Sequence, residues 1–362
     1  MTSTRNSILA AVMIALTLLI VPALQGCQRT PGHVPGPEVR TIAFASCAKA
    51  DQPQQIWQSI LDAEPDLFLF IGDNVYVDIP RPPAGAEDFE RTYAEFEQRQ
   101  PGWRALRREV PVLATWDDHD YGLNDAGKEF ALKRVAQQQF IDFFDLPEDS
   151  PVRQRQGVYD AHLFGPEGRR LQVILLDTRS FRDALVRNPQ GRVDGKGPYV
   201  PRTDGRSTLL GEAQWAWLQA QLERPADVRV IASSIQVIAD EHGWETWGNF
   251  PHERQRLFDL IEKTGAAGVF FISGDRHLTE ASRDAGPATP YPMWDFTSSG
   301  MNERNRPVRE PNTHRTGPVL RTANFGLLRI DWRRDDPAIT FESRGRDGRV
   351  LFAERVLLTE VR

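Results

Sequence analysis

The chain has 362 residues, of which 40% are apolar, and its 44 Lys and Arg against 50 Asp and Glu give a net charge of −6. This length allows one large α/β domain or two small ones. A mildly acidic chain argues against binding of nucleic acid or anionic lipid by the folded surface, but it allows an anionic substrate, because bound cations dominate the local field.

Residues 1–27 have the pattern of a bacterial lipoprotein signal peptide. Arg5 precedes an apolar stretch from Ile8 to Leu24, and small residues come before Cys27. The pattern predicts cleavage before Cys27, lipidation of its thiol, and an exported protein anchored by lipid in the periplasm or at the cell surface. A plain secretory signal and an uncleaved anchor helix are the alternatives.

The remaining chain divides into a tether and one folded domain. Residues 28–38 hold three Pro and two Gly, a composition typical of a tether. Apolar runs and amphipathic stretches begin at Val39, and they predict a single catalytic domain at 39–362.

Short apolar runs and helical periodicities alternate along most of this domain. The predicted strands are 42–45, 67–71, 112–115, 171–176, 228–232 and 269–272. The predicted helices are 53–63, 128–144, 211–222 and 252–262, with further helical material between Phe89 and Leu106. This alternation indicates an α/β fold that opens with a β-α-β unit.

Two later regions have a different character. Residues 187–206 are rich in Gly, Pro, Arg and Asp, which predicts a long irregular segment, either a mobile loop or a rim over a site. Four further strands are predicted at 293–296, 325–331, 339–343 and 350–358, and their spacing indicates sequential antiparallel hairpins.

The segment Asp66 to Asp78 is the most informative stretch. An apolar run ends at Gly72, which allows a close turn, and Asp73 and Tyr76 follow three residues apart. In an open α/β sheet, ligands bind beyond the carboxyl ends of the strands. A carboxylate beside a phenolate suits a hard, highly charged cation such as Fe(III).

The same pattern recurs after three other predicted strands. Their ends carry residues that bind metals or move protons, namely Ser46-Cys47, Trp116-Asp-Asp-His-Asp120 and Ser273-Gly-Asp-Arg-His277. Ordinary strand ends carry turn residues instead. The recurrence therefore predicts one metal site built from four strand ends.

The roles of these residues follow from a two-cation mechanism. Asp73 would bridge two metals, Asp118 would bind the second, and Asp275 and His277 would bind the pair from the far side. Two cations about 3.5–4 Å apart can clamp a phosphoryl group and supply a hydroxide for in-line attack. His119 would protonate or stabilise the leaving oxygen.

Cys47 is the one remaining cysteine if Cys27 carries lipid. A free thiol in an exported protein calls for a reason, and its place at a strand end makes thiolate ligation that reason. A merely buried cysteine is the alternative.

Gly72-Asp-Asn-Val-Tyr76, Trp116-Asp-Asp-His119 and Gly274-Asp-Arg-His277, with Ser46-Cys47 first, resemble the motif set of the PhoD-like alkaline phosphatases. These belong to the calcineurin-like metallophosphoesterases, and the resemblance covers most of residues 39 to 280. It implies a four-layer fold in which helices flank two central mixed sheets, with metals at the carboxyl ends of strands. It also implies Fe(III) with Ca(II), and hydrolysis of phosphate monoesters, and sometimes diesters, outside the cytoplasm.

Carried onto this chain, the resemblance assigns iron to Cys47, Asp73 and Tyr76, helped by His277 or Asp275. It assigns calcium to Asp73 and Asp118; Zn or Mn are alternative metals. The superfamily's mid-chain histidine ligand has no counterpart here, and the residues that could stand in its place are Ser233, Gln236 and Asn249.

Three residues are predicted to bind substrate: Arg276, Asn249 and Arg179. Arg276 lies between two predicted ligands. Arg179 could hold a phosphate through two parallel hydrogen bonds, with a structural ion pair as the alternative. Of the acids around His119, one of Asp117, Asp120 and Asp125 is expected to orient its ring, and the others to be solvated or to cap a helix.

The sequence thus predicts a lipid-anchored phosphatase that acts on small phosphate monoesters through a metal-bound hydroxide. A phosphodiesterase or phospholipase-type hydrolase with the same site is the first alternative. A lipoprotein that only binds metal or phosphate is the second. The predicted partners are the ester and, through the anchor alone, a membrane; no nucleic-acid surface is expected.

Overall fold

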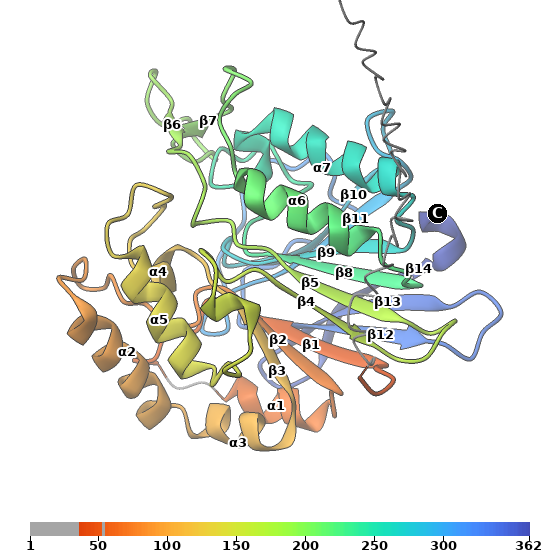
Figure 1. Ribbon diagram of the computed structural model, residues 1–362, viewed down its shortest axis with the longest axis horizontal. Coiled ribbons are helices and arrows are strands. Elements are labelled where there is room, and N and C mark those ends of the chain that lie inside the picture. Colours follow the sequence, from red (N-terminus) through yellow and green to blue (C-terminus); the bar gives the residue numbers. More distant parts are fainter. Residues whose placement is uncertain (1–35, 53–54) are drawn as a thin grey trace, which may run out of the picture. The chain divides into compact units, whose positions relative to one another are not determined.

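The computed structural model describes residues 36–52 and 55–362, and these contain two six-stranded mixed sheets that lie face to face (Figure 1). The first sheet has the spatial order β14 (Val350–Leu357), β13 (Ala338–Gly345), β12 (Asn324–Asp331), β1 (Thr41–Ala45), β2 (Leu67–Ile71) and β3 (Val112–Thr115). The second has the order β10 (Thr279–Asp284), β11 (Met293–Ser298), β9 (Val269–Ser273), β8 (Val228–Ser233), β5 (Leu171–Leu175) and β4 (Asp160–Phe164).

Helices cover the outer face of each sheet. The first sheet packs against α1 (Ile56–Asp62), α2 (Ala86–Arg99), α3 (Pro101–Glu109) and α5 (Lys133–Phe143). The second packs against α6 (Gly211–Leu222) and α7 (Pro251–Thr264). The result is the four-layer α/β sandwich that the sequence predicted.

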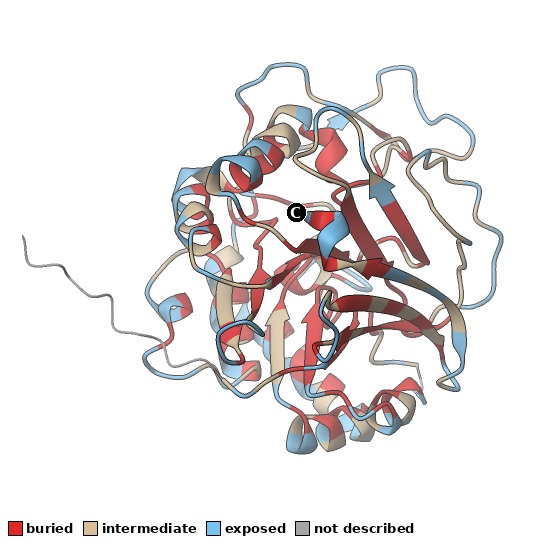
Figure 2. Cartoon of the chain, turned by 90° about the vertical axis from the view of Figure 1, so that its right-hand side faces the viewer, coloured by how far each residue is buried: buried red, intermediate tan, exposed pale blue. Residues whose placement is uncertain are grey.

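Strand β2 shows why these sequences form buried strands. Its side chains alternate, so that Phe68 and Phe70 contact Trp57 in the helical layer, while Leu69 and Ile71 enter the core between the two sheets. All five of its residues are buried. A strand that is covered on both faces reads as a continuous apolar run, and Figure 2 shows such strands in red inside helices with exposed outer faces.

The strand directions bring the functional loops to one edge. Strands β1, β2 and β3 are parallel in the first sheet, and β5, β8, β9 and β11 are parallel in the second. The carboxyl ends of the two sheets meet, since Gly300 N after β11 donates to Ser46 O after β1 at 3.1 Å. A Cβ on Gly274 would lie 2.7 Å from Ser46 Oγ, so only glycine permits this approach.

The structure corrects the prediction for the carboxyl-terminal strands. Strand β11 does not continue a series of hairpins; it lies parallel to β9 in the second sheet, while β12, β13 and β14 form an antiparallel meander in the first. Strands β4 and β10 were missed. Both are edge strands with mixed or polar sequences, and β10 buries Glu280 by pairing it with Gln236 and Arg315.

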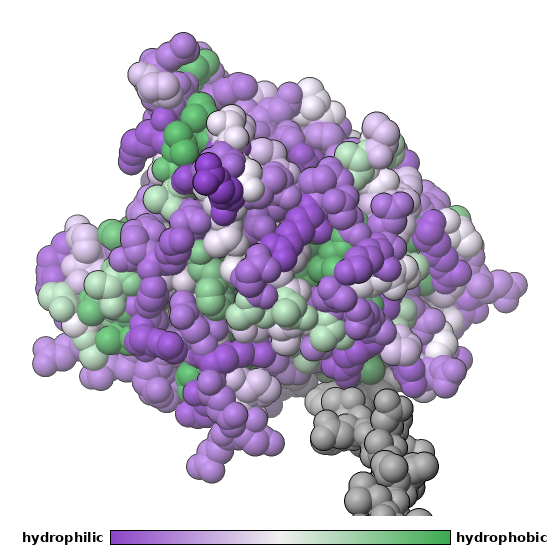
Figure 3. All heavy atoms as spheres, turned by 45° about the horizontal axis from the view of Figure 1, so that its top comes forward, coloured by the Kyte–Doolittle hydropathy of each residue, from purple (hydrophilic) through white to green (hydrophobic). Residues whose placement is uncertain are grey.

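The predicted irregular segment contains one short hairpin, in which β6 (Val186–Arg187) pairs with β7 (Tyr199–Val200). The face in Figure 3 is mostly hydrophilic, with small separate hydrophobic areas. No helix in the described ranges is long and apolar enough to cross a membrane. The predicted signal peptide, its Cys27 and most of the tether lie outside the described residues.

Candidate metal centre

Loops at the carboxyl ends of four strands bring the predicted site residues together. The residues and the strands that they follow are Cys47 (β1), Asp73 and Tyr76 (β2), Asp118 and His119 (β3), and Asp275 and His277 (β9). Asp118 and His119 are the first two residues of the short helix α4 (Asp118–Tyr121), whose N-terminus is capped by a capping box of Asp117 and Asp120. Residues that are far apart in the sequence therefore lie close together at one edge of the fold.

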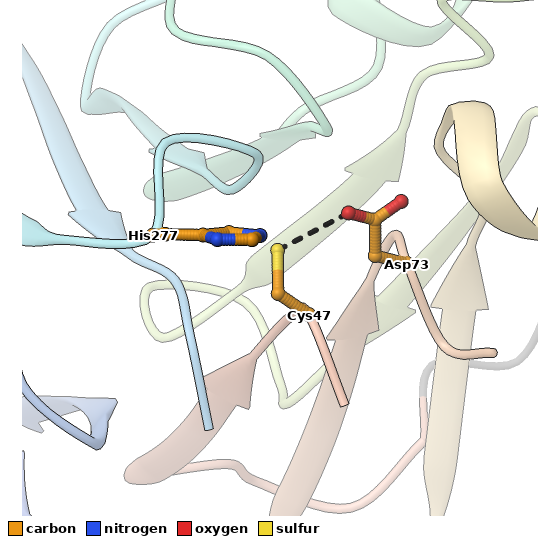
Figure 4. Close-up of side chains that lie close together, drawn as sticks. All are labelled: Cys47, Asp73 and His277. Atoms are coloured by element: carbon orange, nitrogen blue, oxygen red, sulfur yellow. Dashed lines mark hydrogen bonds between the residues drawn. The ribbon is translucent and has the colours of Figure 1, made fainter. Parts of the chain in front are cut away.

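Four of these side chains form one cluster, which we call the cysteine end. Asp73 Oδ2 lies 3.3 Å from both Cys47 Sγ and the hydroxyl of Tyr76, and that hydroxyl lies 3.3 Å from His277 Nε2. Figure 4 shows Cys47, Asp73 and His277 pointing toward one another from different strands. One thiol, one phenol, one imidazole and one carboxylate thus face a common point, as ligands of a single ion do.

Carboxylates dominate the other side of Asp73, which we call the carboxylate end. Asp118 lies there in separate groups with Asp73 and His119, with Asp117 and Asp275, and with Asp125 and Glu245, each group having its ligand atoms within 4.8 Å of one another. Asp118 Oδ2 accepts a hydrogen bond from Asp125 N at 2.7 Å, but the buried Oδ1 has no hydrogen-bond partner among the described residues. A buried carboxylate oxygen without a partner is costly, and a cation would satisfy it.

The backbone is strained at the ligands. Positive φ angles of 62°, 50°, 61° and 53° occur at Cys47, Asp73, Asp275 and His277. This conformation is uncommon for residues other than glycine, and it concentrates at functional sites. Gly72 has φ +111°, and a Cβ there would lie 2.6 Å from Cβ of Asp117, so the predicted need for glycine before Asp73 is confirmed.

Residues whose role the sequence did not show hold the ligands in place. His277 Nδ1 lies 3.0 Å from Glu303 Oε1, a carboxylate–histidine pair that orients Nε2 toward the cysteine end. Ser299 Oγ contacts Cys47 Sγ at 3.1 Å and accepts a hydrogen bond from His277 N at 3.0 Å. Neither residue belongs to a recognisable motif, so only the fold reveals them.

His119 is oriented by Asp78, whose Oδ1 lies 2.7 Å from its Nδ1. The expectation that Asp117, Asp120 or Asp125 would do this was wrong, because those side chains have other partners. Asp117 and Asp120 are buried and cap α4, as one alternative held, and Asp125 Oδ2 accepts from the Tyr199 hydroxyl. Asp78 lies only two residues after Tyr76, so the motif itself was a signal for it.

The concentration of acids perturbs the local pKa values. Burial raises the pKa of Cys47 and of Asp73 well above their ordinary values, and neighbouring acids add to the effect. Burial also raises the pKa of Glu245, to about 7, against the opposing effect of Arg179 and Arg182. For His119, burial is outweighed by Asp118, Asp73 and Asp78, which raise its pKa to about 11. The centre thus holds more negative charge than its own residues neutralise, which favours bound cations.

A cavity of about 260 Å³ opens above the two ends. Asp73, His119 and His277 line it, together with Arg276 and Trp244. The guanidinium of Arg276 lies 2.9 Å from Glu310 Oε1 and stacks over Trp244 at 4.9 Å, while its buried Nε has no partner among the described residues. Arg276 therefore lines the cavity, and its contact with substrate stays a prediction.

The other two residues predicted to bind substrate lie elsewhere. Arg179 is fully buried, and its guanidinium pairs with Asp117 and Glu245, so it forms the structural ion pair that was its alternative. Asn249 is also buried, and its side chain accepts from Thr246 N in a capping box. Neither lines the cavity. The sequence pattern of a strand followed by polar residues does not show whether a polar side chain is buried in a structural contact or exposed to the substrate.

The residues that could stand in for the missing histidine ligand are also occupied within the core. Ser233 Oγ donates to Ile235 O at 2.7 Å, and Gln236 Nε2 donates to Glu280 and to Thr297 at 2.8 Å. Asp125 and Glu245 have carboxylate oxygens that lie within 4.8 Å of one another and of Asp118, so these two residues could hold a cation in that part of the centre.

The convergence of these motifs agrees with a match of residues 42–325 to the model of a family described as PhoD-like phosphatase. The chain belongs to the PhoD-like phosphatase family. Alkaline phosphatase D of Bacillus subtilis (strain 168) is 26% identical to this PhoD-like protein over 281 residues. That alignment covers 67% of the chain and 46% of the relative, so the chain spans less than half the length of this curated relative.

Solved structures confirm the fold of the PhoD-like protein. A structure of PhoD superposes with a TM-score of 0.71 at 19% identity, covering 91% of this chain and 72% of that one. The purple acid phosphatase PPD1 from yellow lupin superposes with a TM-score of 0.59 at 14% identity, covering 90% and 55%. These likenesses show the arrangement of two sheets and flanking helices.

Proposed function

We propose that this PhoD-like protein is a metal-dependent phosphatase that hydrolyses phosphate monoesters. One observation carries the proposal: two ligand sets share Asp73, and Asp73 lines a small cavity together with His119 and Arg276. A cavity of about 260 Å³ suits a phosphate group with part of its alcohol. Family membership adds support at the level of a metal-dependent phosphoesterase.

The donor atoms fit two different cations. The thiol of Cys47, the phenol of Tyr76 and the imidazole of His277 suit Fe(III), because thiolate and phenolate bind a highly charged transition metal well. The carboxylates of Asp118 and Asp275, one with a partnerless oxygen, suit Ca(II). Zn or Mn are the alternative metals. Bound cations would withdraw charge from the phosphoryl oxygens and lower the pKa of a water near them.

The protein's own residues would then orient the ester and move a proton. Asp78 holds Nδ1 of His119, which leaves Nε2 as the nitrogen available to the cavity. In our proposal, Nε2–H protonates the leaving alcohol, and the surrounding carboxylates favour the imidazolium form that this step needs. Arg276 would donate to a phosphoryl oxygen from the cavity wall.

The direct test combines elemental analysis of the purified protein with a panel of phosphate esters. We expect iron and calcium, and turnover of monoesters that exceeds turnover of diesters. A visible charge-transfer band should be present and should be absent in Tyr76→Phe, because the band needs phenolate on Fe(III). Zinc alone would refute the iron–calcium pair but not the phosphatase.

The ester panel also separates the alternatives. Faster turnover of diesters would favour the phosphodiesterase or phospholipase-type hydrolase that uses the same residues. Absence of turnover with metals bound would favour a protein that only binds metal or phosphate. His119 held by Asp78 argues for catalysis, because a binding protein has no need of a positioned proton donor.

We further propose export, with removal of residues 1–26 and lipidation of Cys27. The support is the sequence pattern alone, since those residues lie outside the described ranges. Intact-mass analysis of protein extracted from membranes should show a chain that begins at a lipid-modified Cys27. An unmodified Cys27 would refute the anchor without affecting the metal centre.

A further inference from the structure

Two more cavities continue from the cysteine end of the metal centre. A small one of about 120 Å³ is lined by Cys47 and His277 on one side and by Arg304 and Arg306 on the other. It shares Arg304 and Glu303 with a cavity of about 700 Å³. The cavity at the metal centre shares His277 and Arg306 with the small one, and Glu303 lines all three, so the three cavities adjoin one another.

We call the largest the arginine cavity, because Arg304, Arg346 and Arg349 line it. Arg346 and Arg349 belong to the turn between β13 and β14, and Arg304 belongs to the segment after β11. Residues distant in sequence therefore present guanidinium groups to one space. Apolar side chains of Leu320 and Leu351 line the same space.

The charge of this region is opposite to that of the whole chain. Of the charged residues that line the two cavities, five are basic and two are acidic, namely Lys49, Arg304, Arg306, Arg346, Arg349, Glu303 and Asp347. The net charge of the chain is −6. A local excess of positive charge on an acidic protein marks a surface that attracts anions.

Neither acid forms an ion pair with Arg304 or Arg346 in the described ranges. Glu303 is engaged with His277 Nδ1 at 3.0 Å. Asp347 pairs with Arg349 across 3.6 Å, with both side chains well exposed, and such a pair is weak. Arg304 and Arg346 form no ion pair with any residue of the described ranges. Their charge is available to a ligand.

From this arrangement we propose a second anion subsite in the arginine cavity. The preferred ester carries another anionic group, a phosphate or a carboxylate, on its alcohol. That group binds Arg304, Arg346 and Arg349 while the scissile phosphate lies at the metal centre. The part of the alcohol between the two anionic groups crosses the small cavity, and Leu320 and Leu351 contact the apolar part of that alcohol. The proposal rests on the proposed phosphatase function.

The test compares monophosphates and bisphosphates of alkanediols of increasing length on the metal-containing protein. The two series have similar leaving groups and differ in the second charge. We expect a lower KM for the bisphosphates above a threshold length. In the double variant R346Q/R349Q, the KM for the preferred bisphosphate should rise roughly 5- to 30-fold, while monophosphate turnover stays unchanged.

A matched control is available at the opposite turn of the same meander. Arg333 and Arg334 are also exposed, and Arg333 pairs with Asp331 at 3.0 Å, so R333Q/R334Q removes the same charge far from the cavity. This control should keep the preference for bisphosphates. An alkanoate phosphate and its amide, compared in the same way, show whether a carboxylate also binds.

The outcomes separate the two proposals. Equal KM values for both series, or an equal loss of preference in the control, would refute the subsite and leave the phosphatase standing. Failure to hydrolyse any ester would refute the proposed function. In that case, calorimetry with alkane bisphosphonates still measures binding at the subsite. Binding that is weaker in R346Q/R349Q supports the subsite, and absence of binding refutes it.

Discussion

The two ends of the metal centre share Asp73 but are built differently. The cysteine end offers three kinds of donor atom, and neutral or paired groups such as Ser299 and Glu303 orient them. The carboxylate end offers mainly carboxylate oxygens, and several of its buried oxygens have no partner among the described residues, including Asp118 Oδ1 and Glu245 Oε2. The difference suggests that a single bridged centre can select two unlike cations by donor type.

The supports beneath the two ends differ in the same way. Hydrogen-bonded side chains hold the cysteine end, whereas the fully buried Arg179 and Arg182 hold Asp117 and Glu245 beside the carboxylate end. Positive charge from the protein therefore compensates one end only in part, and cations must supply the rest.

The strongest test removes the residue that joins the two ends. Asp73→Asn should lower kcat/KM about 1,000-fold or more, because stabilisation of several kcal/mol depends on the cations that it bridges. Steady-state kinetics and elemental analysis would measure both effects. Asp66→Asn, at the other end of β2, is the matched control and should keep activity. Undiminished activity in Asp73→Asn would contradict a bridged centre.

The second test concerns the support of the carboxylate end. Arg179→Gln should lower the free energy of unfolding by about 3–5 kcal/mol, because Asp117 and Glu245 would lose their buried partner. Urea unfolding would measure it. Arg99→Gln removes an exposed pair with Glu95 and should cost at most about 1 kcal/mol. Equal losses in the two variants would show that the buried pair has no special role.

The third test addresses the cysteine end alone. Glu303→Gln should weaken the metal bound near His277 by about 10- to 100-fold, because the histidine loses its orienting carboxylate. Competition with chelators and elemental analysis would measure the loss of each metal. Iron should fall while calcium is retained. A parallel loss of both metals would argue that the ends do not bind independently.

The smallest effect should appear in the pH dependence of metal-linked stability. Burial raises the pKa of Asp73, so the protein without cations loses stability as the pH rises from the ordinary carboxyl pKa through the raised one. Burial also raises the pKa of Cys47, which has the same effect from the ordinary thiol pKa upward. Cations bind the deprotonated forms. The difference in Tm between metal-loaded and chelator-treated protein should therefore be larger at about pH 8 than at about pH 5. A constant difference would contradict proton-linked binding.

Sequence patterns predicted the main features of the fold and much of the centre. Buried apolar strands such as β2 read clearly because both faces of the strand are covered. The edge strand β10 did not, because its buried polar residues depend on partners distant in sequence, such as Arg315 for Glu280. Strand β11 was predicted to belong to a series of antiparallel hairpins, whereas it lies parallel to β9, because only tertiary packing selects the neighbours of such a strand.

The sequence by itself determined the local structure around Asp73, because an apolar strand followed by a glycine places the next residue in a turn. Which groups meet that carboxylate is decided in three dimensions. Glu303 orients His277, Asp78 orients His119, and Arg179 is buried in the core, because packing brings together elements far apart in sequence. Residue type and spacing set what a side chain can bind, whereas burial and neighbours set what it does bind.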